Sequence, residues 1–333
     1  MPKERVNLLE SNFDAKVIEK TVSATGIQEV RRAPENKTAF DYCLNATKNL
    51  LNEISFDKAD IDGVVFVTYS GDYISPGNGY LIQSALDLSS DCIIVDLNQA
   101  CAGYINGLFQ AFMLIQSGCC KNVLLCTGDI MSKLISHKSK SEEMIFSDVG
   151  CASIISVSEE PSESVFTFCN DGKKFRSLYI PAGGCRQPIK PGLTDVETAD
   201  EDGNIRTLEN LYMNGLEVMT FVMYAAPATV KELLKIAELT KDDIDMFLFH
   251  QANKTIVKAL ERVLRLPKEK VPLSMQEFGN TTSSSIPLTL CLEKEKNNIA
   301  PNKVVMCAFG NGMACAGATL NLSNTYFGAL HEL

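Results

Sequence analysis

The sequence has no tryptophan, only three histidines and fewer basic than acidic residues. Its 31 lysines and arginines stand against 41 aspartates and glutamates, which gives a formal net charge of −10 and a pI near 5.0. Such a charge disfavours nucleic acid and anionic membranes as partners. No apolar run reaches the roughly 18 residues that a membrane-spanning helix needs. The charged start Met-Pro-Lys-Glu-Arg does not resemble a secretory signal, so we expect a cytoplasmic protein.

Cysteine, by contrast, is abundant, with twelve residues. They are scattered through apolar segments such as VLLCTG, TLCLEK and VVMCAFG. This pattern is typical of free thiols that serve as small buried hydrophobic residues in a reducing compartment. The adjacent Cys119 and Cys120 lack the C-x-x-C spacing of a zinc or redox motif. We therefore expect neither a metal nor another cofactor.

Short apolar runs rich in β-branched residues alternate with longer amphipathic ones, which predicts an α/β fold with a mainly parallel sheet. The predicted strands cover 63–69, 92–97, 122–127, 144–158, 164–170, 244–250 and 303–322. The predicted helices cover 38–54, 77–87, 101–117, 208–237, 252–265 and 284–296.

The two ends of the chain resemble each other. FSDVGCASIISVS (146–158) and GNGMACAGATLNLS (310–323) each give a glycine turn, small residues and then a strand. This repeat predicts two similar halves, 1–170 and 208–333. The segment 171–207 between them is rich in glycine, proline and acidic residues, which is typical of a functional lid or of disorder.

Cys101 stands in DLNQACAGYINGL, where an apolar strand runs into a helix. At the first turn of a helix, unpaired N–H groups and the helix dipole favour a thiolate and lower its pKa. The same N–H groups can hold a developing oxyanion, and the small neighbours leave room for a substrate carbonyl. The position suits a nucleophile, although one more buried cysteine is an equally good interpretation.

His250 and Asn280 are the candidate partners of this cysteine. His250 ends the apolar strand in DIDMFLFHQANKTIVKAL, where open α/β sheets place their ligand sites, although a histidine simply buried in the core is the commoner case. Asn280 follows a glycine turn in EFGNTTSSSIPLTL, where a helix cap would also explain it. The spacing of Cys101 and His250 fits the papain pattern. However, QACAGY does not match the papain motif, and nothing in the sequence indicates secretion.

DLNQACAGYINGL, FHQANKTIVKAL and FGNTTSSSIP, in this order, resemble the β-ketoacyl-ACP synthase III family of the thiolase superfamily. The segments TGIQEVRRA, IFSDVGCASI and CAFGNGMACAGATL are also similar to that family. The resemblance covers nearly the whole chain and implies a duplicated five-layer α-β-α-β-α fold, in most members a homodimer.

The resemblance also implies a two-stage reaction. Cys101 would be acylated by an acyl-CoA or acyl-ACP donor, with the N–H groups of Cys101 and Gly312 as the oxyanion hole. His250 and Asn280 would then stabilise the enolate formed from malonyl-ACP by loss of CO2, and this enolate would attack the acyl group. The product would be 3-oxoacyl-ACP, in fatty-acid initiation or a related specialised pathway.

The sequence departs from the family pattern at several positions. The strand that usually precedes this region in the family has no counterpart before MPKERV, and whether the start is truncated stays open. Lys20 and Ala24 replace the tryptophan and arginine that contact CoA in members using acetyl-CoA. Five basic residues resemble contacts that the family makes with a carrier protein or CoA: Lys140, Lys254, Lys258, Arg262 and Arg265. A solvated helix face explains most of these charges equally well.

Ser75 occupies the place of a phenylalanine that commonly closes the acyl pocket across the dimer. The expected pocket is therefore larger unless Ile74 or Tyr73 fills the space, and we expect a primer longer than acetyl. The segment 185–207 is expected to border the acyl tunnel. Two other functions remain open, a non-condensing acyltransferase with an O, N or S acceptor and a non-catalytic partner subunit. The intact Asn280 disfavours the first, and Cys101 disfavours the second.

Overall fold

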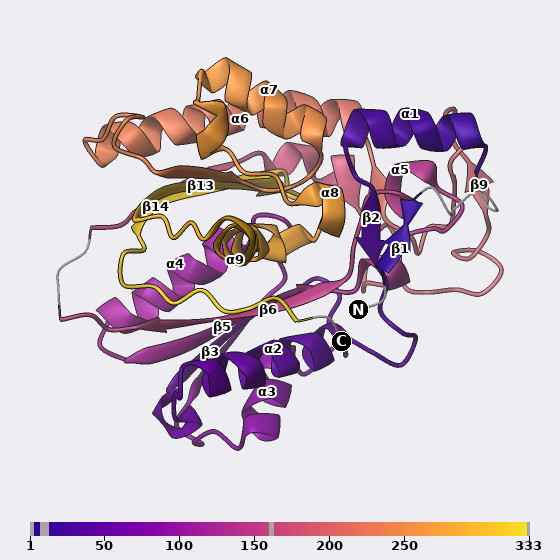
Figure 1. The fold of residues 1–333 in the computed structure, drawn as a ribbon. Coiled ribbons are helices and arrows are strands. Elements are labelled where there is room, and N and C mark those ends of the chain that lie inside the picture. Colours follow the sequence, from indigo (N-terminus) through magenta and orange to yellow (C-terminus); the bar gives the residue numbers. More distant parts are fainter. Residues whose placement is uncertain (1–2, 7–12, 160–162, 332–333) are drawn as a thin grey trace.

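The computed structural model describes residues 3–6, 13–159 and 163–331. Two four-stranded sheets face each other, with helices between them and on both outer sides (Figure 1). The strand order is β4-β3-β5-β6 in the first sheet and β12-β13-β14-β7 in the second. This is the predicted duplicated α-β-α-β-α arrangement of five layers.

The first sheet is built on β3 (Gly63–Val67), whose five residues are all buried. β3 runs parallel to β4 (Ile93–Leu97) and to β5 (Asn122–Asp129). β6 (Val149–Ser156) is antiparallel to β5 and forms an edge of the sheet. Two amphipathic helices cover the outer face, α2 (Ala39–Glu53) and α3 (Asn78–Leu86), and they bury an apolar cluster that includes Phe66, Ile82 and Leu124.

The second sheet repeats this plan. β12 (Met246–Phe249) is parallel to β13 (Lys303–Gly310), and β14 (Ala314–Asn321) is antiparallel to β13. β7 (Val165–Asn170) covers the other side of β14, again antiparallel. The outer helices are α6 (Gly215–Ile236) and α7 (Lys254–Leu264). α6 can approach β14 because Gly317 has no side chain, and a Cβ there would lie 2.5 Å from Thr229 Cγ2.

The middle layer consists of α4 (Gly103–Gln116) and α9 (Ser285–Asn297), which lie between the two sheets (Figure 1). α4 is apolar over most of its surface because it meets a sheet on two sides, whereas α9 is largely buried up to Leu292 and ends in a charged, more exposed stretch over 293–296. Gly107 of α4 contacts β5 closely, since a Cβ there would lie 2.6 Å from Leu125 Cδ1. Cys101 lies just before α4 and Asn280 lies a few residues before α9, so this layer positions both residues near the ends of the sheets.

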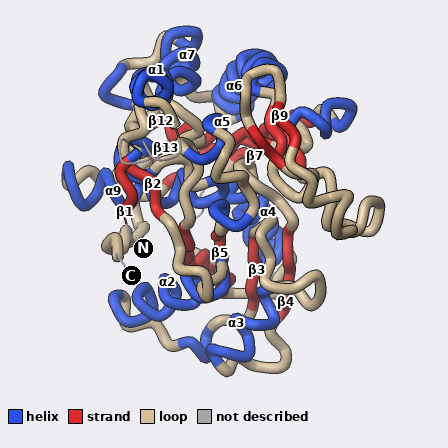
Figure 2. The backbone as a smooth tube through the Cα atoms, turned by 90° about the vertical axis from the view of Figure 1, so that its right-hand side faces the viewer, coloured by secondary structure: helices blue, strands red, loops and turns tan. Residues whose placement is uncertain are grey.

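Shorter elements lie beside the sheets, and Figure 2 labels several of them. They include β1 (Lys3–Arg5), α1 (Ala15–Thr25), β2 (Glu29–Arg31), α5 (Lys140–Glu143) and α8 (Met275–Phe278). Small antiparallel pairs join β8 (Leu178–Tyr179) to β11 (Tyr212–Met213) and β9 (Thr198–Ala199) to β10 (Ile205–Arg206). The sequence patterns did not predict these short elements.

Three expectations need correction. The sheets are mixed rather than mainly parallel, because β6, β7 and β14 each run antiparallel to a neighbour. The boundary predicted at 170 is misplaced, because β7 belongs to the second sheet as the partner of β14. The stretch predicted as one strand over 303–322 is a hairpin of β13 and β14, turned at 311–313.

Candidate active site

The carboxyl ends of β4 and β12 and the loop before α9 bring the candidate residues to one region between the two halves. Cys101 follows β4 and precedes α4, His250 follows β12, and Asn280 lies in the loop before α9. Their exposed fractions are 6%, 1% and 5%, respectively. All three are therefore buried polar groups that need partners inside the protein.

Phe309 and Gly310 link Cys101 to His250. The Phe309 ring meets the His250 ring edge-on, with centroids 5.5 Å apart. Gly310 lies against Cys101, since a Cβ on Gly310 would be 2.8 Å from Cys101 Cβ and 3.3 Å from its backbone nitrogen. A side chain at this position would displace the nucleophile, so the close approach requires glycine.

His250 and Asn280 are joined through Thr282. The backbone of Thr282 forms a hydrogen bond with the His250 ring, and the Thr282 N–H donates to Asn280 Oδ1 at 3.0 Å. Because Oδ1 is engaged in this way, Nδ2 is the donor that the amide can offer to a substrate. Asn280 is itself fixed by backbone hydrogen bonds to Ile145 and Ser147 at 2.8 and 2.9 Å.

The tautomer of His250 follows from its hydrogen bonds. Nδ1 lies 2.8 Å from Ser285 Oγ, and the same Oγ accepts the Gln251 N–H at 3.4 Å. We assign the Ser285 hydroxyl as the donor to Nδ1, and this assignment places the ring proton on Nε2. Burial lowers the pKa of His250 to about 3, and the bond with the Thr282 backbone opposes that shift. The ring is therefore neutral near pH 7, with an N–H donor at Nε2.

The thiol differs from the sequence prediction in two respects. α4 begins at Gly103, with Ala102 as its N-cap residue, so Cys101 stands before the first turn and not in it. Burial and, to a smaller extent, the charge of Asp129 raise the pKa of Cys101 to about 12, although the backbone N–H of Cys101 opposes the shift. The predicted lowering of the pKa is wrong here, because the loss of water outweighs the helix terminus.

The predicted oxyanion donors are Cys101 and Gly312. The structure places Gly310 rather than Gly312 against Cys101, since the nearest atoms to a Cβ on Gly312 belong to Ala314, at 3.4 Å. Gly312 lies in the same turn with φ +123°. That the N–H of Gly312 completes the oxyanion hole stays a prediction.

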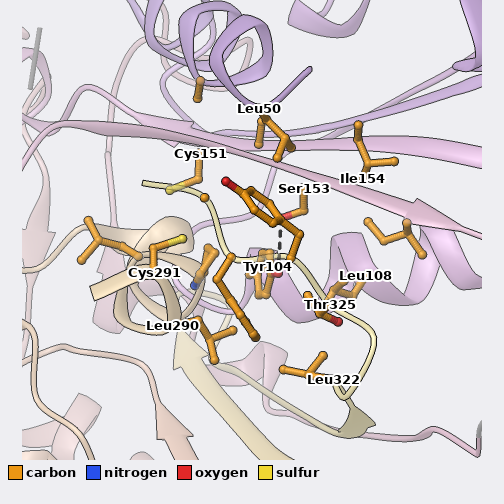
Figure 3. Close-up of a pocket in the computed structure, with 18 of the residues that line it drawn as sticks. Leu50, Tyr104, Leu108, Cys151, Ser153, Ile154, Leu290, Cys291, Leu322 and Thr325 are labelled. Carbon is orange, nitrogen blue, oxygen red and sulfur yellow. Dashed lines mark hydrogen bonds between the residues drawn. The ribbon is translucent and has the colours of Figure 1, made fainter. Parts of the chain in front are cut away.

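A cavity of about 1230 Å³ lies beside the edge strand β6 and apart from these residues. Tyr104, Leu108 and Ile154 line it together with the C-terminal segment, as Figure 3 shows. The Tyr104 hydroxyl is 3.4 Å from Ser153 Oγ inside it. Cys101, His250 and Asn280 do not line this cavity, so it is not the site of the candidate nucleophile.

The predicted basic residues are spread over two elements. Lys140 begins α5, and its ammonium donates to the Asp202 carbonyl. On α7, Lys254 and Arg262 are exposed, whereas Lys258 forms an ion pair with Glu261. Arg265 is the exposed C-cap residue of the helix. Their roles in binding CoA or a carrier protein stay predictions.

Ile74 and Ser75, the predicted pocket residues, lie on the surface of the chain, with Ile74 99% exposed. They therefore do not line a pocket of their own chain. The segment 171–207 contains β8, β9 and β10, and it is bonded to residues near α5 through Ser136–Ile205 (2.6 Å) and Lys138–Glu197 (2.7 Å). That 185–207 borders an acyl tunnel stays a prediction.

All twelve cysteines are free thiols. Among the described residues, no group of three or more histidine, cysteine, aspartate or glutamate side chains is arranged to hold a metal ion. Within the same residues, no helix combines the length and the apolar character needed to cross a membrane.

A duplicated five-layer fold with a buried cysteine, histidine and asparagine at the ends of its strands defines a thiolase-fold enzyme. Family models agree, matching 3-oxoacyl-[acyl-carrier-protein] synthase III at residues 95–172 and the C-terminal part of that family at residues 234–322. The chain belongs to the 3-oxoacyl-[acyl-carrier-protein] synthase III family of condensing enzymes.

Individual relatives support this assignment. A protein of Campylobacter jejuni named as a 3-oxoacyl-[acyl-carrier-protein] synthase 3 is 34% identical over 321 residues, which is 96% of this chain and 89% of that protein. A crystal structure of a 3-oxoacyl-(acyl-carrier-protein) synthase III matches with a TM-score of 0.92 and 32% identity, covering 96% of each chain. The synthase from Burkholderia xenovorans matches with a TM-score of 0.89 and 33% identity, covering 96% of this chain and 90% of that one.

Proposed function

We propose that this protein condenses an acyl group with malonyl-ACP by way of an acyl-Cys101 intermediate. In the first stage, the Cys101 sulfur bonds to the acyl carbon and the carbon–sulfur bond of the donor breaks. The thiol proton leaves with the donor thiol. In the second stage, the bond from the malonyl methylene to its carboxylate breaks and CO2 departs. The enolate attacks the acyl carbon and expels the Cys101 thiolate.

The observation that carries the proposal is the pair of neutral N–H donors offered by His250 and Asn280. The Nε2–H of neutral His250 and the Nδ2 amide hydrogens of Asn280, whose Oδ1 accepts the Thr282 N–H, provide donors without a full charge. Such donors stabilise the negative charge that develops on an enolate oxygen. Ser285, rather than a carboxylate, is the partner of His250 Nδ1. A hydrolase would use an acidic residue at that point, to stabilise the imidazolium that forms when histidine acts as a base.

The oxyanion of the acylation stage has two proposed donors, the backbone N–H of Cys101 and an N–H of the 310–312 turn that includes Gly312. Contact between Gly310 and Cys101 supports this assignment. Lys140 and the basic residues of α7 are proposed to bind the CoA or carrier-protein part of the substrates. The strongly acidic net charge of the chain makes a local basic face a specific feature on which an acidic carrier can dock.

We also propose a homodimer in the cytoplasm. The apolar side chains of Tyr73, Ile74 and Tyr80 are 64%, 99% and 52% exposed, and they lie close together in the chain. Exposed apolar patches of this kind favour association between proteins. In a dimer, the loop at Ile74 and Ser75 would reach the acyl pocket of the second copy, and the small Ser75 would leave space for a longer primer.

Mass spectrometry after incubation with acetyl, hexanoyl and octanoyl donors, each as a CoA and as a carrier-protein thioester, tests this function. We expect Cys101 to be acylated, and the fraction of protein acylated in a given time to be larger with hexanoyl or octanoyl donors than with acetyl donors. Each methylene contributes only about 1 kcal/mol in an apolar pocket, so the preference should be graded. A strong preference for acetyl-CoA would contradict the longer primer, and no increment with any donor would contradict the acyl-enzyme itself.

A further inference from the structure

Asp129 is a buried carboxylate that the reaction described above does not use. It is the last residue of β5 and is 0% exposed. Its Oδ1 accepts hydrogen bonds from the Tyr69 N–H and the Thr68 hydroxyl, both at 3.0 Å. Both donors follow β3 in the first half of the chain. A carboxylate that is fully removed from water requires several such donors.

The second oxygen of Asp129 reaches across to the other half. Oδ2 accepts the hydroxyl groups of Thr282 at 2.5 Å and Ser283 at 3.2 Å. Thr282 has φ +48°, a backbone conformation that β-branched residues rarely adopt. A hydrogen bond to a charged acceptor can hold the residue in this conformation.

Thr282 is also the residue that joins His250 to Asn280. Its N–H donates to Asn280 Oδ1, and its backbone forms a hydrogen bond with the His250 ring. A change in the backbone of Thr282 would therefore move both donors of the proposed enolate site. Ser284, next in the same turn, is separately attached to the Thr127 carbonyl of β5 at 2.8 Å.

We propose that Asp129 is a positioning residue for the decarboxylation stage, because its bond to Thr282 fixes the orientation of His250 and Asn280. The inference deepens the proposed function and rests on it. Asp129 belongs to one half of the duplicated fold and His250 to the other, so the carboxylate aligns the second half's donors with the first half's nucleophile.

Asp129 has a second, separable effect on Cys101. Its negative charge disfavours the Cys101 thiolate. Removal of the charge should therefore make the thiol easier to ionise, while the loss of the Thr282 bond slows decarboxylation. A general loss of packing would not produce these two opposite changes, so their combination is the signature of the proposed role.

The test uses Asp129→Asn and the pair Thr282→Val and Thr282→Ser in the full chain. Asp129→Asn removes the charge at nearly constant shape. Thr282→Val removes the hydroxyl and keeps the β-branch, whereas Thr282→Ser keeps the hydroxyl. Asp62→Asn is the control, because Asp62 accepts the N–H groups of Lys121 and Asn122 at the opposite end of β5.

The rate of CO2 release from malonyl-ACP should fall roughly tenfold or more in Asp129→Asn and Thr282→Val, the size expected for a lost bond to a charged group. Thr282→Ser should retain most of the rate, and Asp62→Asn should match the unmodified protein. Acylation of Cys101 should change by less than about threefold. The pH midpoint for alkylation of Cys101 by iodoacetamide should shift downward in Asp129→Asn.

The ¹⁵N chemical shifts of the His250 ring provide a readout that needs no activity. Only three histidines are present, so the signal can be assigned with His137 and His331 variants. We expect the shifts to change in Asp129→Asn and Thr282→Val and to stay constant in Asp62→Asn. Unchanged ring shifts, or equal losses of acylation and decarboxylation, would overturn the positioning role. If the unmodified protein releases no CO2, the proposed function fails, and the ring shifts still decide the role of Asp129.

Discussion

At the scale of single residues, the three candidate catalytic groups owe their properties to burial. Burial raises the pKa of Cys101 and lowers that of His250, so both groups are uncharged near pH 7 in the structure. A neutral histidine with an Nε2–H donates a hydrogen bond but does not act as a strong base. The site is therefore prepared to stabilise an anion that forms on the substrate, and the thiolate forms only as the donor binds.

Single substitutions should separate the two stages. Cys101→Ala should abolish both acylation and condensation, because the sulfur is the atom that carries the acyl group. His250→Ala and Asn280→Ala should reduce CO2 release by a factor of about 100 or more and leave some acylation of Cys101. Mass spectrometry of the acyl-enzyme and a CO2 assay measure the two stages independently. Normal condensation by Asn280→Ala would disprove its assigned role.

The stability of the protein should fall in acid because of His250. Its pKa of about 3 in the folded chain lies below the ordinary value of 6.5, so unfolding takes up a proton between these pH values. Stability is then fully present above pH 6.5 and is lost as the pH falls toward 3, by at most about 1.4 kcal/mol per pH unit. Asp129 acts in the opposite direction, since burial raises its pKa from 3.8 to about 6. Its contribution to the free energy of unfolding is therefore present in acid and is lost as the pH rises through 6.

Denaturant unfolding of the unmodified protein and of His250→Gln, at several pH values between 7 and 4, measures this effect. The variant lacks the titrating ring, so its stability should decline less steeply as the pH falls. The remaining ionisable groups are shared by the two proteins and cancel in the difference. Parallel curves would show that His250 does not take up a proton on unfolding.

At the scale of elements, the sequence predicted the long helices and strands but not how the strands pair. Apolar runs in the sequence predicted the strands β3, β5, β12 and β13, because strands buried on both faces consist of continuous apolar residues. The direction of pairing is not encoded in such runs, and the antiparallel placement of β6, β7 and β14 follows from connections that the pattern does not specify. Short elements such as α5 escaped prediction because four residues carry no periodicity.

The same distinction applies to the site. Cys101, His250 and Asn280 were identifiable because each stands where an element ends. Asp129 and Ser285 were missed because their roles arise from contacts between segments far apart in the chain. The pKa of Cys101 was predicted in the wrong direction for the same reason, since the depth of burial depends on how the two halves close over α4.

The exposed basic face of α7 should affect the binding of the carrier protein more than the rate of the chemical steps. The double charge reversal Lys254→Glu and Arg262→Glu should raise KM for malonyl-ACP by about fivefold to tenfold at low salt and leave kcat nearly unchanged. Lys258→Glu tests an ion-paired neighbour and should also lose its bond to Glu261. Steady-state kinetics at two salt concentrations measure the effect, and a salt-independent KM in the double variant would count against an electrostatic dock.

At the scale of the whole molecule, the exposed apolar loop should hold two copies together. Ile74→Asp places a charge in the proposed interface, so the protein should sediment as a monomer at micromolar concentration. Ile189→Asp is a matched control, because Ile189 is 60% exposed on a different segment. Sedimentation velocity measures both variants. A dimer that persists in Ile74→Asp would place the interface elsewhere.

The two sheets are alike in plan but unequal at their edges. β7 pairs with β14 from Ala314 to Thr319, whereas β6, among the described residues, has no strand on its outer side and borders the cavity of about 1230 Å³ along its length. β6 and β14 hold corresponding positions in the two halves, so the duplicated chain shows one strand with a neighbour on its outer side and its counterpart without one. The sheet edge in the half that carries Cys101 is therefore less tightly packed than the corresponding edge in the half that carries His250. Thermal breathing of the protein should therefore begin at β6 and α2, on the nucleophile's side of the molecule.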